Sequence, residues 1–375
     1  MSNNKIKVLF CTDGIFPHAV GGMQRHSRLL VEQLAAMQEM ELIVVHPHEG
    51  VSVFNNPAIA EVIVSPGKSS GRYLIDCWNY SKKVYDVALA NPDAVIYSQG
   101  LSMWYNIAKV GKRVIVNPHG LEPYQSLTMR DYLLGTPFRL IFNHLFRNAG
   151  RVVSLGGRLT NILQKLTAPG KVPVLPNAVN VPDATLRNFD HNTQPIQFLF
   201  VGRFALNKGI NVLAQAVKEL NEAGYSGKFI FNLVGKGPLF DTYTKQYVFS
   251  NLNFLGFADD EKLNELYRTN DVFVLPTLFE GMPTVVLEAM AHGMPIIVTD
   301  VGATREMVDT TNGYIIEKND VNSLKKAILD YSKLSSGEKK SMSAASYSRV
   351  KDKFTWKIVA AKHAELFKTL SAALK

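Results

Sequence analysis

Short apolar runs alternate with longer amphipathic stretches along most of this chain. The runs at 7–11, 41–45 and 113–116 have the length and composition of buried β-strands. The stretches at 23–37 and 73–90 carry apolar residues at helical spacing. Because strands that alternate with helices usually pair in parallel, this rhythm predicts a parallel sheet with helices on both faces.

The same rhythm starts again in the second half of the chain. Apolar runs at 197–201, 229–234, 272–275 and 296–298 predict a second set of buried strands. Between the two sets, residues 176–195 are rich in proline, asparagine and aspartate, a composition typical of a linker. We therefore predict an α/β protein with two doubly wound domains. Loops at the carboxyl ends of their strands are expected to bind ligands in a central cleft.

The composition fits a folded protein without membrane spans. The chain has 375 residues, of which 46% are hydrophobic and 19% charged, so we expect two globular domains and no long disorder. The sequence shows no signal peptide and no run of about 18 uncharged apolar residues. Its two cysteines, Cys11 and Cys77, form no C-x-x-C pair, which favours reduced thiols and a cytoplasmic location. The net charge of +9 would attract phosphates, nucleic acid or an anionic membrane, and does not choose among them.

The segment after the predicted strand at 272–275 carries the most chemical information. Pro283 suits the first position of a helix, because the N–H that it lacks has no partner there. Gly293 suits the position just after the helix. The amino end of this helix, near Thr284, would then present free backbone N–H groups that favour a phosphate.

Two glutamates flank this anion site. Glu280 lies in the loop before the helix, and Glu288 lies among apolar residues inside it. A carboxylate in such surroundings needs donors, and the vicinal hydroxyls of a sugar are suitable ones. The alternative for Glu288 is a surface glutamate on a polar stripe of the helix.

A basic loop follows the predicted strand at 197–201. It places Arg203 and Lys208 at a strand end, just before a helix that begins near Gly209. Two fixed cations can stabilise the charge that grows on a departing diphosphate without a metal ion. The alternative is an ordinary basic loop.

Three glycines follow other predicted strands. Gly235 would let the backbone approach a nucleotide. Its surroundings nearly match the dinucleotide fingerprint, but Phe240 stands where the third glycine belongs, which argues against a nicotinamide cofactor. In the first half, Gly21 and Gly22 precede a helix and would let a ligand come close, or they form a flexible loop with a glycine N-cap.

A histidine, His119, follows the predicted strand at 113–116. It can donate to a sugar hydroxyl or take part in proton transfer, although a lone histidine of this kind is more often structural.

At this point the motifs resemble those of glycosyltransferase family 4. They are Val201-Gly202-Arg203 with Lys208-Gly209, and Glu280 separated by seven residues from Glu288-Ala289-Met290-Ala291-x-Gly293-x-Pro295. The segment Pro176-Asn177-Ala178-Val179 is similar to that family's Pro-Asn-Gly-Val, with Ala178 in place of glycine. The resemblance covers nearly the whole chain and is concentrated in residues 198–313.

The resemblance implies a GT-B fold and a transfer that retains the anomeric configuration. It implies an acceptor-side domain at 1–180, to which the last helix at about 356–375 returns, and a nucleotide-sugar donor domain at 181–355. Arg203 and Lys208 would contact the donor diphosphate, Glu280 the donor sugar and Glu288 the ribose. The remaining donor-site positions that the resemblance implies are Gly281, Met282, Pro283 and Thr284 around the sugar and phosphate, Gly21, Gly22 and Gly235 near the nucleotide, Phe257 at the base, and His119 beside the reacting sugar.

Two departures bear on the chemistry. Where many members of the family have Gly-Phe-Gly after the first glutamate, this chain has Gly281-Met282-Pro283, which stiffens the loop that faces the sugar. The chain contains no Asp-x-Asp motif, which often holds a divalent ion at a diphosphate. We therefore expect no metal and no cofactor, with Arg203 and Lys208 in the role of the metal.

The predicted function is the transfer of a sugar from a nucleotide-diphosphate sugar to an acceptor hydroxyl, in polysaccharide or glycolipid synthesis. Two alternatives remain open: a sugar-nucleotide epimerase or hydrolase of the same fold, and a sugar-nucleotide-binding protein without catalysis. The expected acceptor is a glycan or a lipid-linked glycan, and no nucleic acid is expected as a partner. Residues 126–149 combine arginines with leucines and phenylalanines, and either contact the inner face of a membrane or form a helix packed on its own sheet.

Overall fold

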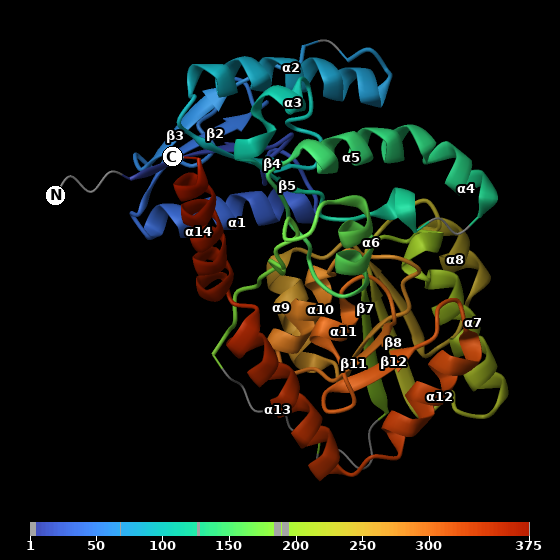
Figure 1. Ribbon diagram of the computed structural model, residues 1–375. Coiled ribbons are helices and arrows are strands. Elements are labelled where there is room, and N and C mark those ends of the chain that lie inside the picture. Colours follow the sequence, from blue (N-terminus) through green and yellow to red (C-terminus); the bar gives the residue numbers. More distant parts are fainter. Residues whose placement is uncertain (1–4, 68, 126–127, 184–188, 190–194, 375) are drawn as a thin grey trace. The chain divides into compact units, whose positions relative to one another are not determined.

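The computed structural model describes residues 5–67, 69–125, 128–183, 189 and 195–374. The chain forms two compact units, each built on one parallel sheet (Figure 1). Unit 1 comprises Met1–Asn177 and Trp356–Lys375, and unit 2 comprises Ala178–Thr355. Parts of the predicted linker, residues 184–188 and 190–194, lie outside the described residues.

Unit 1 contains a six-stranded sheet with the order β3-β2-β1-β4-β5-β6, in which neighbouring strands are parallel. Its strands are apolar because both faces of the sheet are covered. They are β1 (Ile6–Cys11), β2 (Met40–His46), β3 (Ile59–Ile63), β4 (Val95–Gln99), β5 (Val114–Asn117) and β6 (Arg151–Val152).

The helices of unit 1 include one that returns from the end of the chain. They are α1 (Gly22–Ala36), α2 (Tyr73–Ala90), α3 (Ile107–Val110), α4 (Met129–Leu134), α5 (Thr136–Asn148), α6 (Arg158–Leu166) and α14 (Trp356–Ala373). Helix α14 lies beside α1 and against β1 and β4 (Figure 1). Its Phe367 packs on Tyr97, with ring centroids 5.4 Å apart, so the last helix completes the core of the first unit.

Unit 2 repeats the same architecture. Its sheet has the order β12-β11-β10-β7-β8-β9, again with parallel neighbours. The strands are β7 (Ile196–Val201), β8 (Phe229–Val234), β9 (Leu252–Gly256), β10 (Val272–Leu275), β11 (Ile296–Thr299) and β12 (Gly313–Ile316).

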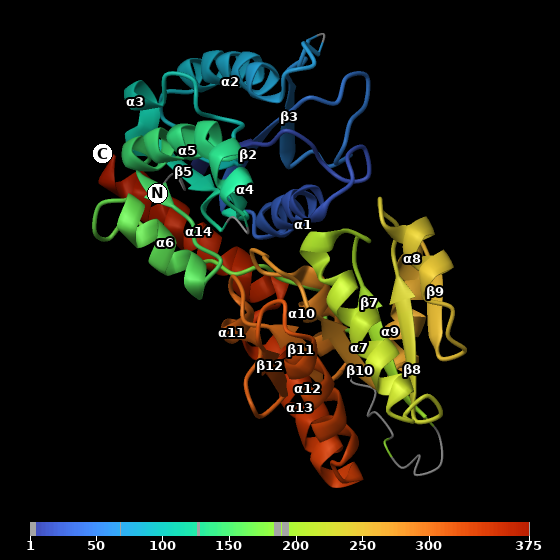
Figure 2. The same cartoon turned by 90° about the vertical axis from the view of Figure 1, so that its right-hand side faces the viewer.

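The helices of unit 2 cover both faces of this sheet (Figures 1 and 2). They are α7 (Ile210–Glu222), α8 (Phe240–Gln246), α9 (Asp260–Thr269), α10 (Thr284–Ala291), α11 (Thr304–Met307), α12 (Val321–Ser332) and α13 (Ser336–Lys353). Helix α7 packs on α12, and α10 packs on α13. Stacked Phe198 and Phe231, with centroids 5.0 Å apart, are part of the buried core.

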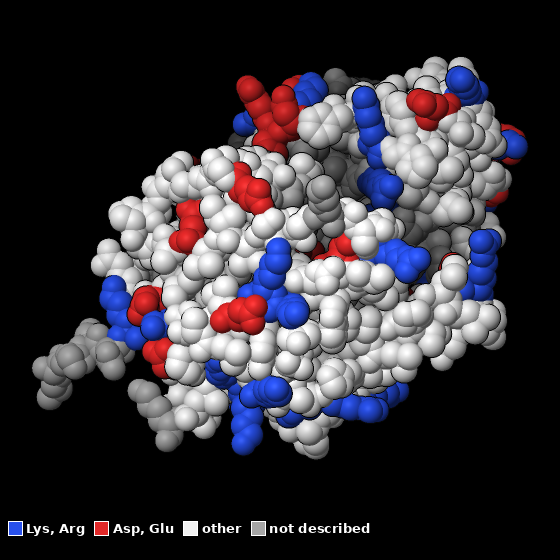
Figure 3. All heavy atoms as spheres, turned by 90° about the horizontal axis from the view of Figure 1, so that it is seen from above, with Lys and Arg blue, Asp and Glu red and all other residues white. Residues whose placement is uncertain are grey.

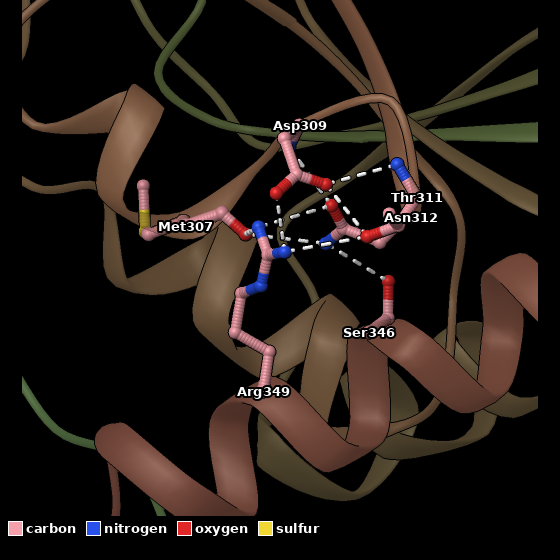
Figure 4. Close-up of polar contacts among 6 residues, drawn as sticks. All are labelled: Met307, Asp309, Thr311, Asn312, Ser346 and Arg349. Carbon is pink, nitrogen blue, oxygen red and sulfur yellow. Dashed lines mark hydrogen bonds and ion pairs between the residues drawn. The ribbon is translucent and has the colours of Figure 1, made fainter.

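Helix α13 is fixed to the segment between α11 and β12 by one arginine (Figure 4). Arg349 donates to the carbonyl of Met307 at 3.1 Å and forms an ion pair with Asp309. Asn312 donates to the same carbonyl and lies next to Ser346. Because Asn312 and Ser346 are buried, these bonds satisfy polar groups that would otherwise destabilise the unit.

Each sheet reverses its strand order at one point. The chain proceeds outward from β1 in one direction and from β4 in the other, and the same holds for β7 and β10. Loops that follow the two central strands therefore diverge and leave a crevice at the carboxyl edge of the sheet, which is the usual ligand site of such sheets. These crevices are at β1/β4 in unit 1 and β7/β10 in unit 2.

The predicted fold class, two doubly wound α/β domains, is confirmed. Among the described residues, no helix is both long enough and apolar enough to cross a membrane.

Candidate functional site

The loop after β7 lies directly against the loop after β10. Gly209 has φ +70°, and a Cβ at this position would lie 1.8 Å from the carbonyl oxygen of Pro276. Only glycine tolerates both that conformation and that contact. The backbone N–H of Leu278 also donates to the carbonyl of Asn207 at 2.8 Å. The two loops therefore meet at the strand reversal of unit 2.

An ion pair bridges these loops. The Nζ of Lys208 donates to Oε1 of Glu280. Their side chains are only 26% and 13% exposed, so water screens the pair less than it would screen a surface pair. The hydroxyl of Thr277, which is buried, lies 3.3 Å from the same carboxylate oxygen. Two residues that were predicted separately, one for the diphosphate and one for the sugar, thus contact each other. Arg203 lies in the same loop as Lys208 and is exposed.

The backbone at Glu280 and Gly281 contacts the loop that follows β11, the strand next to β10 in the sheet. Gly302 follows β11 with φ +52°, and a Cβ there would lie 2.3 Å from the carbonyl oxygens of both residues. The N–H of Ala303 donates to the carbonyl of Gly281 at 2.9 Å. This support fixes the loop that carries the glutamate, and sequence reasoning did not identify it.

The helix after this loop differs from the prediction at its first residue. Pro283 is the N-cap of α10, not its first helical residue, because its ψ of 116° is extended. The first helical residue is Thr284, and no side chain caps the helix. The first N–H groups of α10 therefore have no capping side chain, as a phosphate site requires. Met282 and Pro283 are buried. The predicted helix end is confirmed: Gly293 has φ +68° just beyond His292, the C-cap.

Glu288 receives a hydrogen bond within the protein. The hydroxyl of Tyr267, on α9, donates to Oε2 of Glu288 at 2.9 Å. Tyr267 is buried, and its ring stacks on His292 with centroids 5.2 Å apart. Burial, together with the charge of Glu288, raises the pKa of Tyr267 well above its ordinary value, so this phenol stays a donor. Sequence reasoning missed Tyr267. Its only signal was an aromatic residue at the end of an otherwise charged helix.

The ends of β7 and β8 are packed backbone to backbone. Gly235 has φ +131°, and a Cβ at this position would lie 1.9 Å from the carbonyl oxygen of Gly202. Gly235 is therefore required by this contact, whatever its distance from a ligand. At the end of β9, the side chain of Phe257 is 75% exposed. Both residues lie at the carboxyl edge of the sheet, and their predicted contacts with the nucleotide stay predictions.

In unit 1, Gly21 and Gly22 lie at the start of α1. Gly21 is the N-cap and no side chain caps the helix. A Cβ on Gly21 would lie 2.3 Å from Oε1 of Gln24, and one on Gly22 would meet open space. There is thus open space beside Gly22, and the predicted contact of both glycines with a phosphate stays a prediction.

His119, which is half-buried, lies next to two buried imidazoles, those of His26 and His363. It has φ +58°, and its Nε2 contacts Oε1 of Gln99 at the end of β4. The ring of His26, on α1, lies edge-on to His119 with centroids 5.1 Å apart, and 6.2 Å from His363 on α14. Burial first, and then the neighbouring His363, lower the pKa of His119 to about 3. The ring is therefore neutral at pH 7 and acts through hydrogen bonds, not as a cation.

The tautomer of His363 follows from its partners. One ring nitrogen, Nδ1, lies 2.8 Å from the carbonyl of Val359 and must donate to it. The other, Nε2, accepts from the hydroxyl of Tyr97 at 3.0 Å. That hydroxyl in turn accepts from Asn117 at 3.0 Å. Burial lowers the pKa of His363 to about 4, which keeps this chain of donors intact at neutral pH.

Basic residues are not gathered on the face drawn in Figure 3. Lysine and arginine side chains are scattered there among acidic and uncharged ones. In the described part of the chain, no three histidine, cysteine, aspartate or glutamate side chains are arranged to hold a metal ion. Metal independence stays a prediction.

Comparison with known proteins agrees with this geometry. The family model described as Glycosyltransferase Family 4 matches residues 20–182, and the model described as Glycosyl transferases group 1 matches residues 195–333. An uncharacterized glycosyltransferase of Methanocaldococcus jannaschii is 25% identical over 326 residues, which are 83% of this chain and 84% of that protein.

Two Escherichia coli relatives match a smaller share of their length. A UDP-Gal:alpha-D-GlcNAc-diphosphoundecaprenol alpha-1,3-galactosyltransferase is 30% identical over 176 residues, 43% of this chain and 45% of that protein. A putative colanic acid biosynthesis glycosyltransferase, WcaL, is 24% identical over 241 residues, 61% of this chain and 59% of that protein. This chain thus spans less than two thirds of either of these relatives.

Solved structures show the same fold at low identity. Sucrose-phosphate synthase from Thermosynechococcus elongatus superposes with a TM-score of 0.78 at 19% identity, over 98% of this chain and 100% of that chain. WaaG, a glycosyltransferase involved in lipopolysaccharide biosynthesis, gives 0.71 at 19% identity, over 96% and 99%. The two doubly wound units and their similarity to these structures show that the chain has the GT-B fold of glycosyltransferases. With both family models matched, the chain belongs to glycosyltransferase family 4.

Three neighbouring histidines, His26, His119 and His363, predict how stability depends on pH. Unfolded histidines take up protons near pH 6.5, whereas His119 and His363 do so at about 3 and 4 in the folded chain, and burial also lowers the pKa of His26. The unfolded chain therefore binds more protons as the pH falls from 6.5 toward 4. The free energy of unfolding should fall in this window, by up to ~1.4 kcal/mol per pH unit for each histidine.

The variant His26→Leu tests this expectation, because the ring nitrogens of His26 have no hydrogen-bond partner among the described residues. Urea unfolding between pH 7 and 5 should show a shallower loss of stability than in the wild type. The matched control, His144→Leu, removes an exposed histidine of α5 and should keep the wild-type slope. Equal slopes in the wild type and His26→Leu would show that His26 does not contribute.

Proposed function

We propose that this chain is a retaining, metal-independent glycosyltransferase, which transfers a sugar from a nucleotide-diphosphate sugar to an acceptor hydroxyl. The observation that carries the proposal is the ion pair between Lys208 and Glu280 at the strand reversal of unit 2. The uncapped amino end of α10 begins four residues after Glu280. A cation, a carboxylate and a helix start without a capping side chain thus lie at the carboxyl edge of the same sheet.

Lys208 can serve the diphosphate without leaving Glu280. An ammonium group has three donors, and the carboxylate takes one of them. The others are directed at oxygens that gain negative charge as the bond to the sugar breaks. Exposed Arg203 supplies a second cation from the same loop. Because the pair fixes Lys208 before the donor binds, little reorganisation accompanies the reaction, which is the condition under which fixed charges accelerate it most.

The two glutamates have separate roles in this proposal. Glu280 uses its remaining acceptor capacity for hydroxyls of the donor sugar. A carboxylate offers about four acceptor sites, so Glu288 can keep its bond from Tyr267 and also accept from the ribose hydroxyls. Tyr267 is then a positioning residue that orients Glu288.

Retention of configuration follows from attack on the face that the phosphate leaves. The departing phosphate takes the proton of the acceptor hydroxyl, and the bond between the sugar and the phosphate breaks as the new glycosidic bond forms. We assign no enzyme nucleophile. His119, which is neutral at pH 7, would hydrogen-bond a sugar hydroxyl beside the reacting carbon.

The names of the relatives support a substrate class. One is named as a transferase from UDP-Gal to a sugar linked to a lipid diphosphate, and another as an enzyme of colanic acid synthesis. We propose that this chain likewise takes a nucleotide-sugar donor and a glycan or lipid-linked acceptor, in polysaccharide or glycolipid synthesis at the cytoplasmic side of a membrane.

The charged loop provides the test of this function. Arg203→Ala and Lys208→Ala should each lower kcat about a hundredfold, as removal of one fixed donor does at comparable sites. The matched control is Lys228→Ala, an exposed lysine just before β8, at the opposite edge of the sheet, and it should keep the wild-type rate. Transfer from UDP-, GDP- and ADP-sugars is measured, and NMR of the product reports the configuration at the anomeric carbon. Near-normal rates in both variants, or an inverted product, would contradict the proposal.

Residues 126–149, the segment considered for membrane contact, are partly buried in the core and partly exposed. Residues 126 and 127 lie outside the described residues. In α5, Phe142, Leu145 and Phe146 are buried, as a helix packed on its own sheet requires. In α4, Leu133 and Leu134 are 64% and 66% exposed beside an exposed arginine, Arg130. We propose that α4 is the part that contacts anionic lipid.

Flotation with phosphatidylglycerol vesicles at low salt tests this contact. The wild type should float with the vesicles, and Leu133→Glu with Leu134→Glu should abolish flotation, because two carboxylates would enter the apolar layer. Leu89→Glu, at an exposed position of α2, is the control that should still float. A wild type that stays at the bottom at low salt would exclude the contact.

A further inference from the structure

Aromatic side chains gather at the carboxyl edge of the unit 1 sheet. Trp78, on α2, lies edge-on to Trp104 and Tyr105, with ring centroids 4.7 Å and 4.9 Å apart. Trp104 and Tyr105 belong to the loop after β4, one of the two central strands. Trp78 remains 40% exposed, and Tyr73, at the start of α2, is 60% exposed. Large aromatic surface thus reaches solvent beside the loop that follows β4.

The cluster is held in place by its backbone. The hydroxyl of Ser81, which is fully buried on α2, accepts from the N–H of Trp104 at 2.7 Å and of Tyr105 at 2.8 Å. The indole N–H of Trp104 donates to the carbonyl of Cys77 at 3.4 Å. These bonds fix the loop to the helix, so the exposed face of Trp78 is ordered before any ligand binds. Such preordering reduces the entropy cost of binding.

A carboxylate follows the residue after β1 that α2 contacts. The hydroxyl of Tyr80, on α2, donates to the carbonyl of Thr12 at 2.6 Å, which ties the helix to the end of β1. Asp13 is the next residue, and its side chain is exposed. Burial raises the pKa of the Cys77 thiol; a hydrogen bond with Tyr73 opposes this shift, and the charge of Asp13 adds to it. Asp13 thus follows directly on the residue that Tyr80 contacts, and Tyr73, seven positions before Tyr80, lies on the same face of α2.

Aromatic faces next to a carboxylate match the chemistry of a sugar ring. The C–H groups of a pyranose ring form an apolar face, which packs on an aromatic ring, and its hydroxyls donate to a carboxylate. The position fits as well, because ligands of doubly wound sheets bind where the loops after the two central strands diverge. A nucleotide is a poorer occupant, since the negative charge of Asp13 would repel its phosphates.

We infer that Tyr73, Trp78 and Asp13 form the binding site for a pyranose ring of the acceptor glycan. This inference rests on the proposed function and names the acceptor subsite within it. Trp78 and Tyr73 provide the apolar surface, and Asp13 accepts hydrogen bonds from ring hydroxyls. Because the site lies wholly in unit 1, it is separate from the residues proposed to hold the donor diphosphate.

Tryptophan fluorescence tests binding without turnover. The chain has three tryptophans; two are in the cluster, and Trp356 is buried. Quenching by acrylamide therefore reports mainly on the cluster. Titration with the methyl α-pyranosides of galactose, glucose and N-acetylglucosamine should reduce quenching for at least one of them. In Asp13→Asn, about tenfold more of that sugar should be needed. Quenching that none of the three alters, or that Asp13→Asn leaves unchanged, would overturn the inference.

Kinetics provide the second test. Trp78→Ala should raise the KM for the acceptor about tenfold and leave the KM for the donor unchanged, because only the acceptor contact is lost. Trp78→Phe keeps an aromatic face, so it should raise the acceptor KM less than Trp78→Ala does. If Trp78→Ala does not fold, Trp78→Phe takes its place in the test. Leu89→Ala, on the same helix, should change neither constant. An unchanged acceptor KM in the tryptophan variants would overturn the inference while transfer itself continues. Absence of transfer by the wild type would instead refute the proposed function, and the fluorescence titration would still report on the site.

Discussion

The ion pair between Lys208 and Glu280 joins the loops that follow the two central strands of unit 2. At this reversal of strand order the loops diverge, so nothing in the sheet itself brings their side chains together. Two glycines make the contact feasible. Gly209 allows the loop after β7 to contact Pro276. Gly302 allows the loop after β11 to pack against the backbone of Glu280. The donor site that we propose depends on this pair, because it fixes a cation and a carboxylate where a diphosphate and a sugar would meet.

The two units repeat one architecture but differ in chemistry. In unit 2 the strand-end loops carry charged groups, which suit a substrate that carries charge. In unit 1 the corresponding edge carries neutral histidines and exposed aromatic rings, which suit the hydroxyls and C–H faces of a sugar. Helix α14 connects these neutral histidines to the fold, because His363 from this helix packs against the ring of His26 and accepts a hydrogen bond from Tyr97. Its return to unit 1 therefore completes the neutral site as well as the core.

Much of this fold was predictable from local patterns, and the contacts within the site were not. Strand-length apolar runs and amphipathic stretches were enough to predict two doubly wound sheets, because period and length are local properties. The pairing of Lys208 with Glu280 spans 72 residues, and that of Tyr267 with Glu288 spans 21; neither segment specifies its partner. Pro283 was predicted one position too far into the helix, because proline is compatible with both the N-cap and the first turn and only the observed ψ separates them. Trp78 and Trp104 gave no signal, since aromatic residues in an amphipathic helix usually belong to the core.

A double-mutant cycle on the ion pair tests the central claim most directly. Lys208→Met, Glu280→Gln and the double variant are compared by kcat/KM for the nucleotide sugar. If the pair acts as one unit, the double variant should be hardly worse than the poorer single variant, with a coupling of at least about 1 kcal/mol. Additivity of the two single effects to within about 0.5 kcal/mol would contradict the claim, because it would mean that lysine and glutamate act independently of the contact between them.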